Sequence, residues 1–239
     1  LDAANAPMLA ADVAATVEVN GATTEYANFQ DAWNAANSGG RAVLTLLRDV
    51  DVPSALNVAS GSDIVLRGGS YTITSSSNHT IDVYGTFTLE SGVVEGRRMG
   101  IFVSGGSANI SGGNISASDG SGICLNGTAS LTMTGGTAYG AKYGLEITRT
   151  RDSDPSSITL SGGNVSGGTR SIAIFNSIYT QLRVSSLLAA GCAYYDENGS
   201  LVDYPEIESL SGAVTIRECD HSSTRWEQDD TTHRSICRG

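Results

Sequence analysis

Residues 130–136 of the chain read Ser-Leu-Thr-Met-Thr-Gly-Gly, and this block of alternating polar and apolar residues followed by a glycine pair recurs. Residues 107–113 read Ser-Ala-Asn-Ile-Ser-Gly-Gly, and residues 157–163 read Ser-Ile-Thr-Leu-Ser-Gly-Gly. Related blocks occupy residues 64–69 and 87–92. The last apolar residues of the five blocks are 23, 21, 23 and 27 positions apart, since they are Leu66, Leu89, Ile110, Met133 and Leu160. The sequence is therefore built on a repeat.

A second alternating segment lies between or after the blocks, at residues 81–83, 101–103, 123–125, 145–147 and 172–174. Alternation with a period of two predicts strands with one buried face. A single repeat is too short to bury that face, whereas stacked repeats bury it together. Leucine-rich repeats have a similar period but need a leucine-rich consensus with an asparagine, which is absent here. We therefore predict an all-β fold, a right-handed parallel β-helix, in which the five residues named above form one inward column.

The open ends of such a solenoid need caps, because they expose the core and the strand edges. Asn20-Gly21 predicts a hairpin before the coils, and Asn198-Gly199 predicts another after them. Residues 28–37 predict a short helix that covers the core. The expected organisation is a flexible tail (1–12), an N-terminal cap (13–50), the coils (51–190), a C-terminal hairpin cap (191–218) and a Cys/His segment (219–239).

The charge balance argues against one class of partner. The formal net charge is −11, from 25 acidic and 14 basic residues. Nucleic-acid binding needs a basic footprint, so we expect no nucleic-acid partner. No segment approaches the ~20 apolar residues of a membrane span, so we also expect no membrane insertion.

Several segments resemble a known family. Residues 17–21 (Val-Glu-Val-Asn-Gly), 29–36 (Phe-Gln-Asp-Ala-Trp-Asn-Ala-Ala) and 42–49 are similar to the N-terminal cap of pectin-lyase-like, right-handed β-helix domains in surface proteins of Gram-positive gut bacteria. Residues 218–221 and 231–237 resemble the Cys-x-His and His-x3-Cys parts of a module that often follows those domains. The final cysteine of that module is missing here. The resemblance implies a secreted, cell-surface protein, while the fold hosts lyases, hydrolases and adhesins alike.

The second alternating segments place two columns of side chains on their outward face. One column is Asp82, Phe102, Cys124, Glu146 and Ala173; the other is Tyr84, Ser104, Asn126, Thr148 and Phe175. Long basic and aromatic residues enter the same strands, and the 27-residue coil carries an insertion at residues 149–155, where solenoids often place a binding loop. The candidate ligand-binding residues are His79, Arg98, Lys142, Tyr143, Arg149, Arg151, Arg170, Tyr84, Phe102 and Glu146.

Arginine pairs with carboxylates and tyrosine stacks on apolar faces, so this set favours a glycan ligand. The alternative is that these side chains lie on solvent-exposed turns and bind no ligand. Asp82 and Glu146 are the only acids in the two columns. At ~4.8 Å per coil, three coils place them ~14 Å apart, beyond the roughly 5–9.5 Å of glycosidase carboxylate pairs. We therefore assign no catalytic residue.

These observations predict a non-catalytic binding or adhesion module of a larger extracellular bacterial surface protein, with a glycan or a host or bacterial surface component as partner. A polysaccharide lyase or glycoside hydrolase of the pectate-lyase type is the first alternative. A purely structural stalk is the second.

The Cys/His segment leaves three alternatives open. Cys219, His221, His233 and Cys237 are a chemically sensible tetrahedral set for structural Zn²⁺. In an oxidising compartment Cys219 and Cys237 would instead form a disulfide. The third alternative is that neither forms. No cofactor is expected for the β-helix itself.

Overall fold

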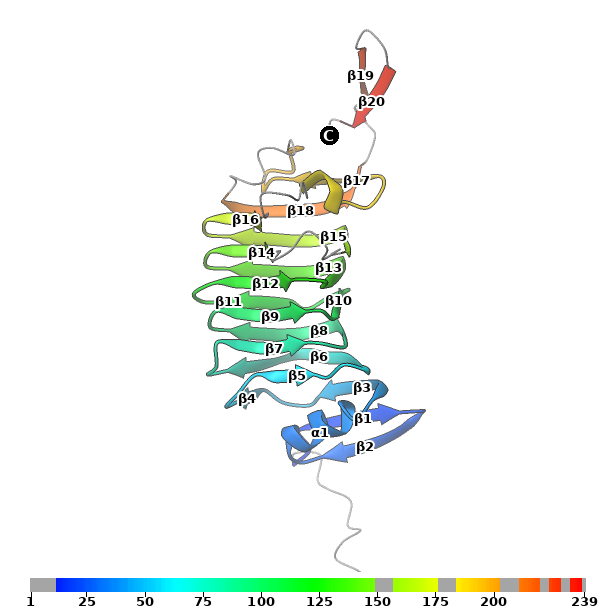
Figure 1. The fold of residues 1–239 in the computed structure, drawn as a ribbon, viewed down its shortest axis with the longest axis vertical. Helices are drawn as coiled ribbons and strands as arrows, with labels where there is room; N and C mark the ends of the chain where they lie inside the picture. The colour runs from blue at the N-terminus through cyan, green and yellow to red at the C-terminus, as the bar shows by residue number, and fades with distance from the viewer. Residues whose placement is uncertain are drawn as a thin grey trace, which may run out of the picture.

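The computed structural model describes residues 12–148, 157–175, 184–202, 211–219, 224–228 and 233–237. The chain is almost entirely β-structure and forms a parallel β-solenoid of about six turns (Figure 1). The predicted fold class is therefore confirmed. Among the described residues, no helix combines the length and the apolar character needed to cross a bilayer.

Each coil contributes strands to two sheets. The parallel strands of the larger sheet are β3 (Gly40–Leu46), β4 (Val50–Val52), β6 (Ser62–Ser75), β8 (Thr86–Gly96), β10 (Ser107–Ile110), β11 (Asn114–Ala117), β13 (Ser130–Gly140) and β15 (Ser157–Gly167). The six-stranded sheet contains β5 (Leu56–Val58), β7 (His79–Val83), β9 (Met99–Ser104), β12 (Ser121–Asn126), β14 (Tyr143–Thr148) and β16 (Arg170–Phe175).

The inward column lies where the repeat places it. Leu66, Leu89, Ile110, Met133 and Leu160 pair in register between successive coils, and each is at most 1% exposed. Each of these side chains therefore packs mainly on its counterparts in the coils above and below, which gives the core its one-dimensional character.

The last glycine of each block marks a bend, which lies within a long strand in four blocks and between β10 and β11 in the block at residues 107–113. At Gly136 the backbone has φ of 77°, a left-handed conformation that glycine adopts without a Cβ clash. A Cβ there would also lie 2.7 Å from the carbonyl oxygen of Gly112 in the preceding coil. The equivalent glycines of the other blocks likewise have positive φ; they are Gly69, Gly92, Gly113 and Gly163. The glycine at the end of the repeat is thus explained by the bend and, at Gly136, also by the close stacking of coils.

The N-terminal cap consists of β1 (Ala15–Val19), β2 (Ala22–Tyr26) and α1 (Phe29–Ala36). Asn20 and Gly21 form the turn between β1 and β2, with φ of 51° and 80°. The helix begins after Asn28, whose side chain accepts a hydrogen bond from the backbone nitrogen of Gln30 at 2.7 Å. Its buried face closes the first end of the core.

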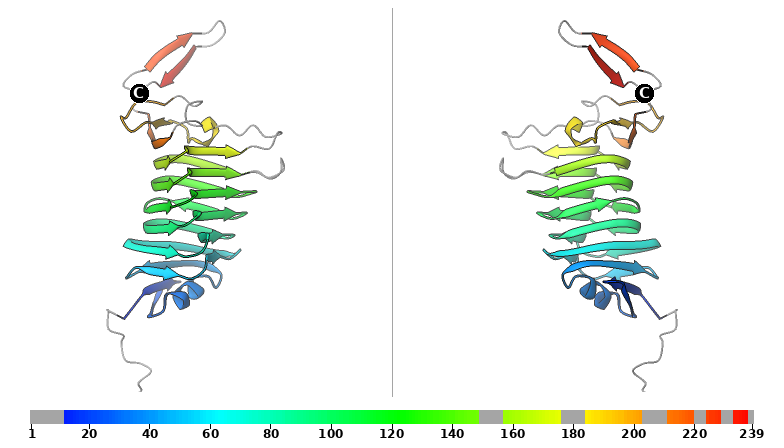
Figure 2. Two further views of the ribbon diagram at one scale, coloured as in Figure 1. Left: turned by 90° about the vertical axis from the view of Figure 1, so that its left-hand side faces the viewer. Right: turned by 90° about the vertical axis from the view of Figure 1, so that its right-hand side faces the viewer.

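The other end is closed by a change of strand direction. Strand β18 (Gly212–Glu218) pairs antiparallel with β15, and β17 (Cys192–Tyr195) pairs antiparallel with β18. The short helix η2 (Val184–Leu187) lies nearby, and the buried Tyr194 hydroxyl donates to the carbonyl oxygen of Val184 at 3.0 Å. Strands β19 (Thr224–Gln228) and β20 (His233–Cys237) form a separate antiparallel pair. Figure 2 shows the two caps at opposite ends of the stack.

Candidate functional site

The outward side of the six-stranded sheet, here called the six-strand face, carries most of the predicted ligand-binding residues. The register matches the prediction, because Asp82 pairs with Phe102, which pairs with Cys124, which pairs with Glu146. A neighbouring column at the start of the strands runs from His79 through successive coils to Tyr143 and Arg170.

The first cluster on this face joins β7 and β9. Nδ1 of His79 lies 2.8 Å from Oδ1 of Asp82, and the His79 ring lies 4.9 Å from the ring of Phe102 between centroids. The side chains of His79 and Asp82 are 27% and 15% exposed. The Asp82 carboxylate therefore holds the imidazole against Phe102, and the three side chains form one fixed surface.

The second cluster joins β14 and β16. The rings of Tyr143 and Phe175 meet edge to face, with centroids 5.4 Å apart, and Phe175 is 42% exposed. Arg170 is the register partner of Tyr143 and so lies next to this pair. Tyr84 is 44% exposed just beyond the end of β7, at the start of the predicted column that ends with Phe175.

The middle of the face is closed, which differs from the expected exposed column. Cys124 is 2% exposed and Ala173 is fully buried. Both are short side chains whose register neighbours include the larger Phe102 and Glu146, and at ~4.8 Å spacing such neighbours shield them. Burial, aided by the nearby Glu146 charge, raises the pKa of the Cys124 thiol to about 12. A thiol in this state is a poor nucleophile at neutral pH.

Glu146 serves the stacking of coils. Its Oε2 accepts a hydrogen bond from the hydroxyl of Ser121, a buried residue of the preceding coil. Asp82 and Glu146 remain three register steps apart, so these two acids do not converge. Within the described part of the chain, no group of three or more His, Cys, Asp or Glu side chains is arranged to hold a metal ion.

Two predicted basic residues lie at the corner where the larger sheet turns into the six-stranded sheet. The backbone carbonyl oxygen of Arg98 accepts a hydrogen bond from the backbone nitrogen of Ser121. The backbone nitrogen of Lys142 donates to the carbonyl oxygen of Gly120. Arg98 and Lys142 are both exposed, so they border the six-strand face rather than lie on it. Arg149 and Arg151 lie outside the described residues.

The tail adds one observation to its three alternatives. Cys219 is disulfide-bonded, while Cys124 and Cys192 are free. A sulfur in a disulfide has no thiolate to offer Zn²⁺, so this state of Cys219 favours the disulfide alternative. His221 lies outside the described residues, as do the side chains of His233 and Cys237.

A groove that sequence reasoning missed lies around the corner from the six-strand face. It has a volume of about 410 Å³ and lies at the ends of the long strands of the larger sheet. Its lining residues come from four coils, which is why no local motif reveals it. It is lined by Thr74, Ser75, Glu95, Gly96, Arg97, Ser116, Ala117, Ser118 and Tyr139.

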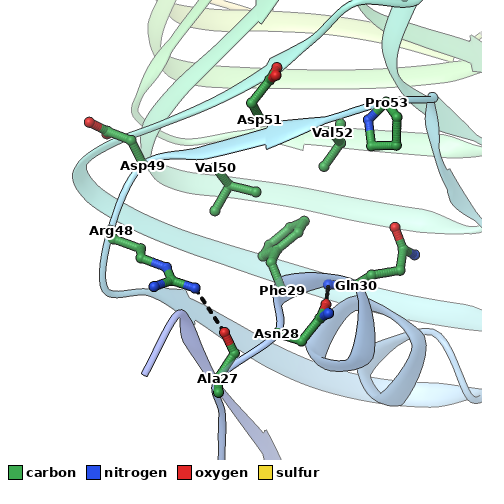
Figure 3. A pocket seen from close by; sticks show the side chains of 10 residues that line it. All are labelled: Ala27, Asn28, Phe29, Gln30, Arg48, Asp49, Val50, Asp51, Val52 and Pro53. Carbon is green, nitrogen blue, oxygen red and sulfur yellow. Dashed lines mark hydrogen bonds between the residues drawn. The ribbon is translucent and has the colours of Figure 1, made fainter. Parts of the chain in front are cut away.

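A larger cleft of about 670 Å³ lies between α1 and β4, and its polar groups serve the fold (Figure 3). The guanidinium of Arg48 donates to the carbonyl oxygen of Ala27 at 2.8 Å. The carboxylates of Asp49 and Asp51 point away from the helix and accept hydrogen bonds from β6. Phe29 faces the strand across the cleft. We therefore interpret this cleft as the seam between cap and coils.

Comparison of the chain with family models, with curated proteins and with solved structures finds no match. The pectin-lyase-like resemblance therefore stays a prediction.

Proposed function

We propose that this chain is a non-catalytic, extracellular binding module of a larger bacterial surface protein that recognises a glycan on its six-strand face. The observation that carries the proposal is the pair of aromatic clusters, His79 with Phe102 and Tyr143 with Phe175. The first cluster lies on β7 and β9, the second on β14 and β16, and β12 lies between them. An extended glycan that crosses these strands therefore has a ring to stack on near each end. Strand-borne side chains lose little freedom on binding, which favours affinity.

The border of the face supplies polar contacts. Arg98 and Lys142 are exposed at one edge of the six-strand face. Arg170 lies on the face itself, as the register partner of Tyr143. Guanidinium groups donate several hydrogen bonds in a fixed plane, which suits sugar hydroxyls and carboxylates. The disulfide at Cys219 supports an extracellular location, because disulfides persist in oxidising compartments.

The state of the acids favours binding over catalysis. Asp82 is held by His79, and Glu146 by Ser121. Glycoside hydrolysis by two carboxylates needs the pair within roughly 5–9.5 Å, whereas these two belong to coils three register steps apart.

A glycan array probed with the intact chain tests the proposal. We expect hits, and we expect Phe102→Ala and Tyr143→Ala to weaken them about fivefold to thirtyfold, the effect of losing ~1–2 kcal/mol at an aromatic anchor. Tyr71→Ala is the matched control, since Tyr71 is 37% exposed on β6 of the other sheet.

The same array glycans should be recovered without unsaturated or reducing-end products. Turnover that disappears in Asp82→Asn or Glu146→Gln would replace the proposal with the enzymatic alternative. An array without hits, from a protein that melts cooperatively, would leave the structural stalk as the better account.

A further inference from the structure

We propose that the groove around Tyr139 is a second, separate site, which binds a single neutral pyranose residue. The register defines its floor, because Thr74 pairs with Glu95, Glu95 with Ser116, and Ser116 with Tyr139. Four successive coils therefore contribute one outward side chain each. A volume of about 410 Å³ falls within the range of about 300–1,000 Å³ for small-molecule sites.

Tyr139 forms the apolar wall. Tyr139 is 46% exposed, and its ring does not pack against another aromatic ring of the described residues. Its backbone is fixed by ladders on both sides, to Ser116 and to Ser166. The neighbouring coil also packs closely, because a Cβ on Gly122 would lie 2.7 Å from the Tyr139 carbonyl oxygen. A flat ring on a fixed backbone is a preorganised surface for the C–H face of a sugar.

Glu95 and Arg97 supply the polar contacts. Both are exposed, and neither has an ion-pair partner among the residues that the structure describes. They are two positions apart at the same strand end. A carboxylate accepts and a guanidinium donates, so together they complement sugar hydroxyls, each of which does both. Hydroxyls of Ser116 and Ser118 line the same groove.

The charges select a neutral sugar over an acidic one. Glu95 and Arg97 cancel within the groove, so no net positive charge remains for a uronate. The formal charge of −11 over the whole chain adds repulsion toward polyanions. The occupant that fits this chemistry is a neutral hexose or N-acetylhexosamine.

Saturation-transfer NMR of the intact chain tests the site, with methyl glycosides of glucose, galactose, mannose and N-acetylglucosamine as probes and methyl glucuronide as the acidic comparison. We expect transfer to the ring protons of at least one neutral glycoside and weaker transfer to the glucuronide. Tyr139→Ala should weaken binding about fivefold to thirtyfold. Tyr139→Phe, which keeps the ring, should retain most of it.

The controls separate this site from the six-strand face. Tyr71→Ala should leave the transfer unchanged, since Tyr71 lies on β6 and does not line the groove. Transfer that survives Tyr139→Ala but is lost in Phe102→Ala would overturn the groove and leave the proposed function standing. Transfer that is lost only in Tyr139→Ala, together with array hits that Phe102→Ala does not weaken, would support the groove and overturn the proposed function. Absence of transfer to every probe, or stronger transfer to the glucuronide, would overturn the inference.

Discussion

The side-chain amide of Asn37 pairs with the backbone of strand β5 as another strand would, its nitrogen donating to the carbonyl oxygen of Asn57 at 2.8 Å. Its oxygen accepts a hydrogen bond from the backbone nitrogen of Ala59 at 2.9 Å. The indole nitrogen of Trp33 donates to the same Asn57 carbonyl at 3.1 Å. The exposed edge of the six-stranded sheet is thus satisfied by side chains of the cap, which blocks further strand addition there.

Replacing Asn37 by alanine should therefore destabilise the fold and open this edge. We expect a loss of ~1–2 kcal/mol in the free energy of unfolding, because two hydrogen bonds disappear. Urea denaturation measures the loss, and light scattering measures any association through the freed edge. Asn34→Ala is the control, since Asn34 only accepts from the Gln30 side chain on the same helix. Equal stability of the two variants would show that Asn37 does not protect the edge.

Two glycines allow the cost of backbone strain to be separated from the cost of a clash between coils. Gly61 and Gly136 both have positive φ, at 87° and 77°, but a Cβ at Gly61 would meet nothing within 4 Å. Gly61→Ala should cost ~1–2 kcal/mol from backbone strain alone. Gly136→Ala adds a clash with Gly112 and should cost ~1–3 kcal/mol more. Thermal unfolding compares them, and similar melting temperatures would mean that the coils can separate locally.

Cys124 should resist modification in the folded protein. The reactive form of cysteine is the thiolate, and a pKa of about 12 leaves Cys124 protonated at pH 8. Mass spectrometry after iodoacetamide treatment should find Cys192 alkylated first, with Cys124 modified only after unfolding. The pKa of Cys124 in the folded protein lies above the ordinary value of 9.0. Above about pH 9 the unfolded chain therefore loses a proton that the folded chain keeps. Cys124 thus lowers the free energy of unfolding as the pH rises above about 9. Rapid alkylation of Cys124 at pH 8 would contradict this environment.

A thiol count tests the state of the tail. The denatured but unreduced chain should show two free thiols, which peptide mapping assigns to Cys124 and Cys192. Reduction should raise the count to four, the total in the sequence. Stoichiometric zinc in the purified protein, lost in Cys237→Ser, would instead establish the metal alternative.

The fold was predictable because its determinants are local and repeated. Alternation and the glycine pairs fix which side chains point inward, so the column through Leu89 and Ile110 follows from the sequence alone. The register of His79, Tyr143 and Arg170 followed for the same reason.

Burial on the outer face was less predictable, because it depends on neighbours above and below rather than along the chain. Cys124 reads as exposed from alternation, yet its side chain is closed off between coils. The groove shows the same limit. Glu95 and Tyr139 are far apart in sequence, and only the corner geometry of successive coils brings their strand ends to one place.

The arrangement of the caps has a mechanical consequence. They lie at opposite ends of the stack, and the ladder hydrogen bonds between coils run along the line that joins them (Figure 2). Tension applied from cap to cap therefore pulls along these hydrogen bonds. It does not slide neighbouring strands past each other, as a shear force would. A protein anchored through its two caps would lengthen by releasing coils and so act as an extensible tether under flow.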